Sequence, residues 1–194
     1  ENLTMAWRFK GANQGEGDIL DIISSILSNG KAGLFDTDLT QTMKVQGVNA
    51  GTDEQHDYTA FIALGMPNQG QKLEEVRALI LEEMGKLRRG EFADDLIPAV
   101  IANKKLDFYK SLDDNDQRAT MMGNAFINDQ DWAQVANQLE RQSKLTKKDI
   151  VEFAQKYLRD DNFVCVYKRM GEDKTLVKIE KPAITPIPAN REYE

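Results

Sequence analysis

The sequence predicts a single α+β domain with a mostly antiparallel sheet and with its helices packed on one face. Strand-like and helix-like segments are grouped along the chain instead of alternating singly, which favours an α+β architecture over a parallel sheet. The first segment alternates apolar and polar residues, as does a strand with one buried and one open face. The chain has 194 residues, of which 41% are hydrophobic, and this is enough for one sizeable domain.

The N-terminal segment carries the clearest strand signal. Its inward positions are Leu3, Met5, Trp7 and Phe9, and the polar positions of its open face are Thr4, Arg8 and Lys10. Apolar residues at helical spacing then predict a helix over 19–27, which Asp18 can cap and which Asn29 and Gly30 end. A short second helix is predicted over 34–43.

Two strands and a long helix are predicted next. The strands cover 45–50 and 58–64, and a polar turn at 51–57 joins them. The long helix covers 72–89, and Gly90 closes it. This order places a strand pair between two helical regions, as the α+β interpretation requires.

Four further helices and a C-terminal hairpin complete the predicted domain. The helices cover 95–109, 115–126, 131–142 and 147–158. The last of them starts with a variant of the capping box, formed by Thr146 and Asp149. Apolar strands at 163–169 and 175–179 are predicted to form a hairpin through Gly171.

The organisation and charge of the chain limit its function. Residues 1–180 form the predicted domain, and the proline-containing stretch 181–194 is predicted to be an extended linker. The net charge is −7 and the basic residues are scattered, which argues against a nucleic-acid surface. The apolar runs are too short to span a membrane. Because the chain begins at Glu1 without an initiator methionine, we expect a piece of a longer protein, whose compartment stays open, an extracytoplasmic one included.

The sequence offers no catalytic group and no metal site. Zinc hydrolysis needs several imidazole and carboxylate ligands at fixed spacing, but the one histidine, His56, lies in a polar turn where we expect it to be solvated. Cys165 lies in an apolar strand, where we expect a small buried hydrophobe and no pairing with His56. The glycine-rich stretches 11–17 and 29–33 are interpreted as turns and caps, because neither carries the Gly-Lys-Ser/Thr of a phosphate loop.

Two other features are interpreted as structural. Adjacent acids such as Glu74 and Glu75 usually form the solvated face of a helix rather than an acid–base pair. Trp132, like Trp7, lies in an amphipathic pattern and is expected in the core rather than on a stacking platform.

Several segments in order, and at comparable spacing, carry a family resemblance. They are the strand and helix that lead into Leu34 and Phe35, the strand pair that ends at 61–64, and the segments 71–76, 87–92 and 145–150. This ordered set covers nearly the whole chain. It resembles the non-catalytic domain of the pitrilysin/insulinase family of zinc metallopeptidases, the inverzincins.

The resemblance implies both a fold and a role. The fold is a metallopeptidase-like domain of the mitochondrial processing peptidase/LuxS type. In the family, a separate catalytic domain carries His-x-x-Glu-His and binds zinc, and that motif is absent here. The resemblance therefore implies a non-catalytic domain that helps to enclose the substrate chamber and to bind unfolded peptides. Its partner would be the catalytic domain of the same polypeptide or of a sister subunit, and Thr4 and Arg8 would line the chamber.

One feature of the family is missing. Some members hold substrate with an arginine and a tyrosine in a non-catalytic domain, but Thr40 and Gly47 stand at the matching place here. That role cannot be carried over. The chain therefore resembles the second domain of a long member, followed by a connector, rather than the last domain.

Two other functions stay open at this point. The same fold could serve assembly in a complex without peptidase activity, as in the core subunits of a respiratory complex. The chain could also be an independent binding module or an unrelated enzyme. His-x-x-Glu-His upstream of Glu1 in the parent gene would support the peptidase, and its absence would support assembly; metal-independent activity of the chain alone would support the third reading.

Overall fold

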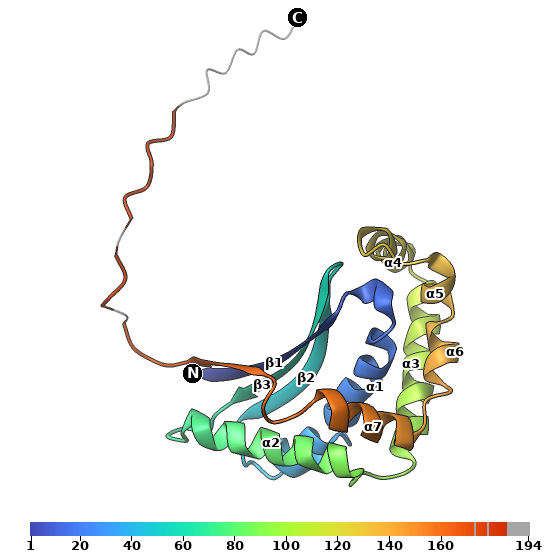
Figure 1. Cartoon of the computed structure of the whole chain (residues 1–194), viewed down its shortest axis with the longest axis horizontal. Helices are drawn as coiled ribbons and strands as arrows, with labels where there is room; N and C mark the ends of the chain where they lie inside the picture. The colour runs from blue at the N-terminus through green and yellow to red at the C-terminus, as the bar shows by residue number, and fades with distance from the viewer. Residues whose placement is uncertain (173, 178, 186–194) are drawn as a thin grey trace, which may run out of the picture.

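A four-stranded antiparallel sheet is the centre of the computed structural model, which describes residues 1–172, 174–177 and 179–185 (Figure 1). The strands of this described part are β1 (Asn2–Lys10), β2 (Gly47–Glu54), β3 (Tyr58–Met66) and β4 (Val164–Lys168). Their spatial order is β2-β3-β1-β4, and every neighbouring pair is antiparallel. The predicted α+β class with an antiparallel sheet is confirmed.

The helices lie on one side of this sheet (Figure 1). Three of them pack next to it: α1 (Gly17–Leu27), α2 (Leu73–Arg89) and α7 (Lys147–Tyr157), the last through the ring of Phe153, which stacks on that of Phe9 in β1. The others are α3 (Leu96–Leu112), α4 (Asn115–Ile127), α5 (Trp132–Ala136) and α6 (Gln138–Gln142). Helices α3 and α6 pack against α1 and form an outer layer. Two layers of helices therefore cover one face of the sheet, and the other face stays open. Among the described residues, no helix is both long enough and apolar enough to span a membrane.

The core sits between the sheet and α1, α2 and α7. Trp7 is 1% exposed, and its ring lies 6.0 Å from the ring of Phe61 and 5.1 Å from that of Phe163. Its indole Nε1 donates a hydrogen bond of 3.0 Å to the carbonyl oxygen of Arg159, which satisfies the one polar atom of the side chain. The inward positions predicted for β1 are all buried, so the period-two interpretation is confirmed.

Strand β2 is longer than predicted. The strand was expected to end at 50, but pairing with β3 continues through Glu54, and the turn contains only 55–57. Gln55 closes it with a hydrogen bond of 3.1 Å from its amide to the carbonyl oxygen of Tyr58. Polar residues extend the strand because its main chain completes the ladder of β3, while its open face needs no apolar side chains.

Two predicted helices are shorter or divided. The segment predicted as a helix over 34–43 contains a single π-helical stretch, Asp36–Thr40. The helix predicted over 131–142 is divided at Asn137, whose φ of −98° and ψ of 12° leave the α region. The change of direction lets Gln142 become buried and donate a hydrogen bond of 2.8 Å to Asp21 on α1, so a tertiary contact overrides the helical pattern.

Two predictions for apolar residues are wrong. Trp132 is 43% exposed and does not join the core. The described residues 174–177 and 179 lie in no strand, and the predicted hairpin partner at 175–179 is absent from them; Lys178 itself lies outside the described residues. Leu176 and Val177 are 74% and 85% exposed, so they lack the packing surface that makes an apolar run a strand.

The C-terminal part of the chain leaves the predicted domain boundary untested. Residues 181–185 are exposed and lie in no helix or strand. The rest of the predicted linker, 186–194, lies outside the described residues. The boundary at 180 therefore stays a prediction.

Candidate functional site

The open face of the sheet is the surface that the sequence singled out. In β1, Arg8 is exposed and Thr4 is half-buried, while Trp7 between them points into the core. Thr4 pairs with Leu64 of β3 and Val166 of β4, so it lies at the middle of the sheet. The side on which each of these residues lies agrees with the predicted alternation.

The open face is more apolar than β1 alone indicates. One row across all four strands contains Val164, Ala6, Ile62 and Gly51. Val164 and Val166 lie on β4, the strand that pairs with β1, and are 65% and 57% exposed. The sequence of β1 alone predicts a polar open face. The face in fact carries both polar and apolar side chains, because β3 and β4 contribute apolar ones.

A polar end of this face lies next to the β2–β3 turn. The guanidinium of Arg8 stands 4.9 Å from the centre of the Tyr58 ring, in a cation–π contact. Arg8 and Asp53 are both paired with Ala60, so a cation and an anion flank a small residue. Such an arrangement offers donors and acceptors to a passing main chain, and its centre is not crowded by a large side chain.

Two glycines of β2 contribute to the same face. Gly47 and Gly51 are paired with Met66 and Ile62. An added Cβ at either glycine would meet no atom of the described chain within 4 Å, and neither backbone requires a positive φ. Glycine weakens a strand interior and often marks close approach by another backbone. The packing of this chain does not require either glycine, so both are compatible with an approaching peptide.

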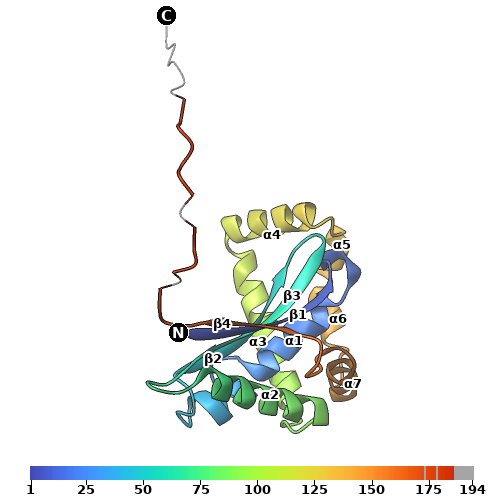
Figure 2. The same cartoon turned by 60° about the vertical axis from the view of Figure 1, so that its left-hand side comes forward.

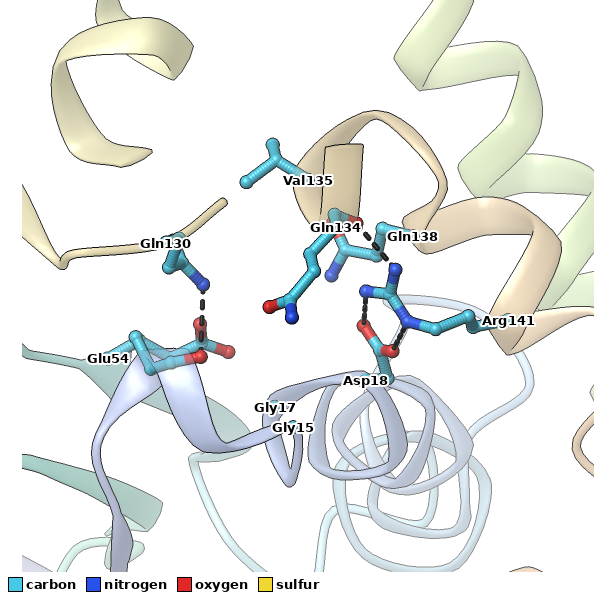
Figure 3. A pocket seen from close by; sticks show the side chains of 10 residues that line it. Gly15, Gly17, Asp18, Glu54, Gln130, Gln134, Val135, Gln138 and Arg141 are labelled. Atoms are coloured by element: carbon cyan, nitrogen blue, oxygen red, sulfur yellow. Dashed lines mark hydrogen bonds and ion pairs between the residues drawn. The ribbon is translucent and has the colours of Figure 1, made fainter. Parts of the chain in front are cut away.

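A separate polar pocket of about 100 Å³ lies beside the start of α1 (Figure 3). Arg141 of α6 binds Asp18 there, with 2.6 Å between Nε and Oδ2. Gln130 donates a hydrogen bond of 3.0 Å to the carbonyl oxygen of Ala12. Burial, together with the charges of Asp21 and Asp18, raises the pKa of Glu54, which also lines the pocket.

The polar residues of this pocket are better explained as contacts that hold two parts of the domain together than as a ligand-binding site. Its carboxylates repel the phosphate that a glycine-rich loop before a helix would otherwise attract. A Cβ added at Gly17 would lie 2.6 Å from Oε1 of Glu54, so the Glu54 carboxylate already occupies the space beside this glycine and would have to move aside. The pairs from Arg141 and Gln130 attach the α4–α6 region to the β1–α1 connection.

The residues considered for catalysis are not brought together. The His56 side chain is 54% exposed at the tip of the β2–β3 turn, where its Nδ1 lies 2.7 Å from Oδ1 of Asp57. Cys165 of β4 pairs with Met5 of β1 and packs against the core, as expected of a small hydrophobe, but it is only partly buried. The fold thus gives no Cys–His pair. Within the described residues, no group of three or more His, Cys, Asp and Glu is placed to hold a metal ion.

We expect the chain alone to bind no zinc in stoichiometric amount. One histidine and one cysteine, located on different parts of the sheet, cannot supply the three or four ligands of a zinc site. Elemental analysis after dialysis against zinc and then against buffer measures this. A value near one tightly bound zinc per chain would contradict the expectation.

The family is decided by residues 1–104, which match the description "Peptidase M16 inactive domain". These residues contain β1, α1, β2, β3 and α2, which form most of the sheet and its covering layer. The chain belongs to the peptidase M16 inactive-domain family. This confirms the predicted resemblance to the non-catalytic domain of the pitrilysin family. No curated protein sequence matches the chain.

Solved structures share the fold of this M16 domain. A protease from Helicobacter pylori superposes with a TM-score of 0.80 at 18% identity, over 84% of this chain and 40% of that chain. The inactive peptidase domain of a protein named as a zinc protease from Bordetella parapertussis gives 0.72 at 15% identity, over 90% and 95%. Complex III2 from Candida albicans gives 0.70 at 11% identity, over 84% and 41%. The M16 domain thus spans well under half of the Helicobacter pylori protease.

Proposed function

We propose that this M16 domain helps to enclose the substrate chamber of a zinc metalloendopeptidase and presents the open face of its sheet to peptides. A separate catalytic domain, of the same polypeptide or of a sister subunit, would bind the zinc and hydrolyse the peptide. The observation that carries the proposal is the uncovered face that holds Arg8, Thr4 and the two unneeded glycines of β2.

The chemistry of this face suits unfolded peptides of varied sequence. Val164 and Val166 of the edge strand β4 and Ile62 of β3 offer weak apolar contact, and Arg8 and Asp53 offer charged groups at one end of the face. Small side chains and glycines between them let a main chain approach closely. A surface that combines few strong contacts with open space favours transient binding over tight binding.

We expect Arg8→Ala in the full-length enzyme to raise KM for acidic peptides by roughly tenfold, the equivalent of one hydrogen bond to a charged group. The zinc content should not change, because Arg8 would contact substrate and not metal. Steady-state kinetics over a panel of acidic and basic peptides, with elemental analysis of each variant, measure both. Lys148→Ala is the matched control, since it removes a cation that is 80% exposed on the helical side. Equal kinetics for both variants and the wild type would leave Arg8 a solubility role only.

A second variant of the same face tests the glycines. Gly51→Val adds a side chain where the described chain leaves open space, and it raises the strand propensity of that position. The thermal midpoint should therefore stay level or rise, while KM rises for all peptides regardless of charge. An unchanged KM would show that no main chain approaches β2 closely.

The alternative is an assembly role in a complex without peptidase activity. It is favoured by one observation, the similarity of the fold to a chain of complex III2 from Candida albicans. Zinc-dependent peptide hydrolysis by the purified full-length protein, abolished by a chelator and restored by zinc, would support the peptidase. Absence of hydrolysis, together with stable incorporation into a larger complex, would support assembly.

A further inference from the structure

Helix α4 carries an apolar stripe that the described part of the chain does not cover. Its members recur at helical spacing and are Ala119, Met122, Gly123, Phe126 and Ile127. Phe126 is 88% exposed, Ile127 67% and Met122 55%. This spacing is typical of the face that a helix buries, yet the residue of α4 that is buried is Ala125, which borders the stripe and is not one of its members.

Trp132 extends the stripe beyond the helix. Together with Met122, Ala125, Phe126 and Gln130, it lines a shallow apolar depression of about 360 Å³. The exposure of Trp132, which contradicts the core position predicted for it, is thus part of the same feature. An exposed apolar patch of this kind is typical of an interaction surface.

The position of the stripe is fixed by the rest of the domain. Asp114 caps α4 by accepting a hydrogen bond of 2.7 Å from the amide of Asp116. Beyond the other end of the helix, the Gln130 side chain donates a hydrogen bond to the carbonyl oxygen of Ala12. The amide of Ala12 in turn donates one to the carbonyl oxygen of Gln55 in the β2–β3 turn. Helix α4 therefore lies beside the polar end of the open face, and both views show it next to the tip of the β2–β3 hairpin (Figures 1 and 2).

Gly123, in the middle of the stripe, points to close approach by another element. Glycine inside a helix costs about 1 kcal/mol relative to alanine. Its backbone has no positive φ, and an added Cβ would meet no atom of the described chain within 4 Å. The fold of this chain does not need glycine there, whereas a partner packed on the stripe would.

The charges around the stripe identify the kind of partner. Acidic residues flank it at both ends: Asp113, Asp114 and Asp116 before it, and Asp129 and Asp131 after it. The one cation of α4, Arg118, is engaged with Leu112 and Asn115. A second copy of this chain would bring two acidic rims together, which disfavours self-association. The fitting partner is an apolar ridge flanked by lysine and arginine.

We propose that the α4 stripe, with Trp132, is the surface on which the catalytic domain of the parent peptidase docks. The proposal rests on the proposed function. It is supported by the length of the Helicobacter pylori protease, of which a domain like this one covers 40%, so that most of such a protein is available as a partner. It is also supported by the place of α4 beside the open face, because a domain that borders the substrate surface there would reach the stripe.

Hydrogen exchange tests the contact. Amides of α4 should exchange roughly tenfold more slowly in the full-length protein than in this chain alone, because docking suppresses local opening of a helix that is otherwise solvent-exposed on most sides. In the full-length protein, the double variant Phe126→Ser, Ile127→Ser should lose that protection, while α1 and α2 keep theirs. Met43→Ser is the matched control, since Met43 is 78% exposed elsewhere on the surface.

The outcomes separate this proposal from the proposed function. Equal exchange of α4 in the two proteins would overturn the docking surface, even if the full-length protein is a zinc-dependent peptidase. Protection that appears in this chain as its concentration rises would also overturn it, in favour of a second copy. Protection of α4 in a full-length protein without zinc-dependent hydrolysis would support the contact with the neighbouring domain and overturn the peptidase function.

Discussion

Trp7→Ala is expected to lower the free energy of unfolding by roughly 3–5 kcal/mol, the range for large aromatic residues removed from a core. Trp7 is 1% exposed and packs between Phe61 and Phe163. Its replacement leaves a cavity at the meeting point of β1, β3 and the segment before β4. It also leaves the carbonyl oxygen of Arg159 without its indole donor.

Urea titration followed by circular dichroism measures this loss. Trp132→Ala is the control, because the same side chain is removed at a position that is 43% exposed, and we expect a loss below about 1.5 kcal/mol there. Trp7→Phe separates packing from hydrogen bonding and should recover most of the loss. Similar losses for Trp7→Ala and Trp132→Ala would show that the core is not centred on Trp7.

Lys86→Met is expected to lower the free energy of unfolding by about 3 kcal/mol, because it leaves a buried charge without its partner. The side chain of Glu83 is 1% exposed, and its Oε1 lies 2.9 Å from Nζ of Lys86. The same Nζ lies 2.6 Å from Oδ2 of Asp38, in the π-helical stretch. Lys86 therefore balances two carboxylates that connect α2 to that stretch.

The loss should depend on pH in a defined direction. Burial raises the pKa of Glu83 above its ordinary value, and Lys86 opposes that rise. Lys86 lowers the pKa of Asp38, so the Asp38 contribution is present above the ordinary pKa of the carboxyl and is lost as the pH falls through its folded-state value. Without Lys86, Glu83 can relieve its charge only by binding a proton. The destabilisation should accordingly be larger at about pH 7.5 than at about pH 5.5.

A double variant separates lost charge balance from lost packing. Glu83→Gln removes the buried charge, so Lys86→Met combined with Glu83→Gln should be more stable than Lys86→Met alone and should lose most of the pH dependence. Thermal unfolding of the three variants at both pH values measures this. A double variant as unstable as Lys86→Met, with the same pH dependence, would show that Lys86 acts through its aliphatic chain.

Local sequence patterns correctly predicted two kinds of feature. One is a strand or helix with a strictly apolar face, and the other is a contact between residues close in sequence. The alternation in 3–9 predicted which side chains of β1 face the core, and Trp7 is buried while Arg8 is exposed, as predicted. Thr146 and Asp149 form the expected capping box, in which each bonds the backbone of the other. The order of segments also gave the family, which the match over residues 1–104 confirms.

Other features depend on neighbours that no local pattern contains. The helix over 131–142 divides at Asn137 because Gln142 reaches Asp21, which is more than a hundred residues away in sequence. The open face is mixed because Val164 and Ile62, from two other strands, flank Ala6.

Apolar periodicity indicates that a surface is to be buried, and the sequence of this protein determined that much for β1 and for α1. What covers each surface was decided only by the tertiary structure. The stripe of α4 has the same spacing as a core-facing helix, yet Phe126 is 88% exposed, and Trp132 beside it is 43% exposed. The physical reason is that hydrophobic burial is non-directional: it favours removal of apolar area from water by any partner, whether from the same domain or from another.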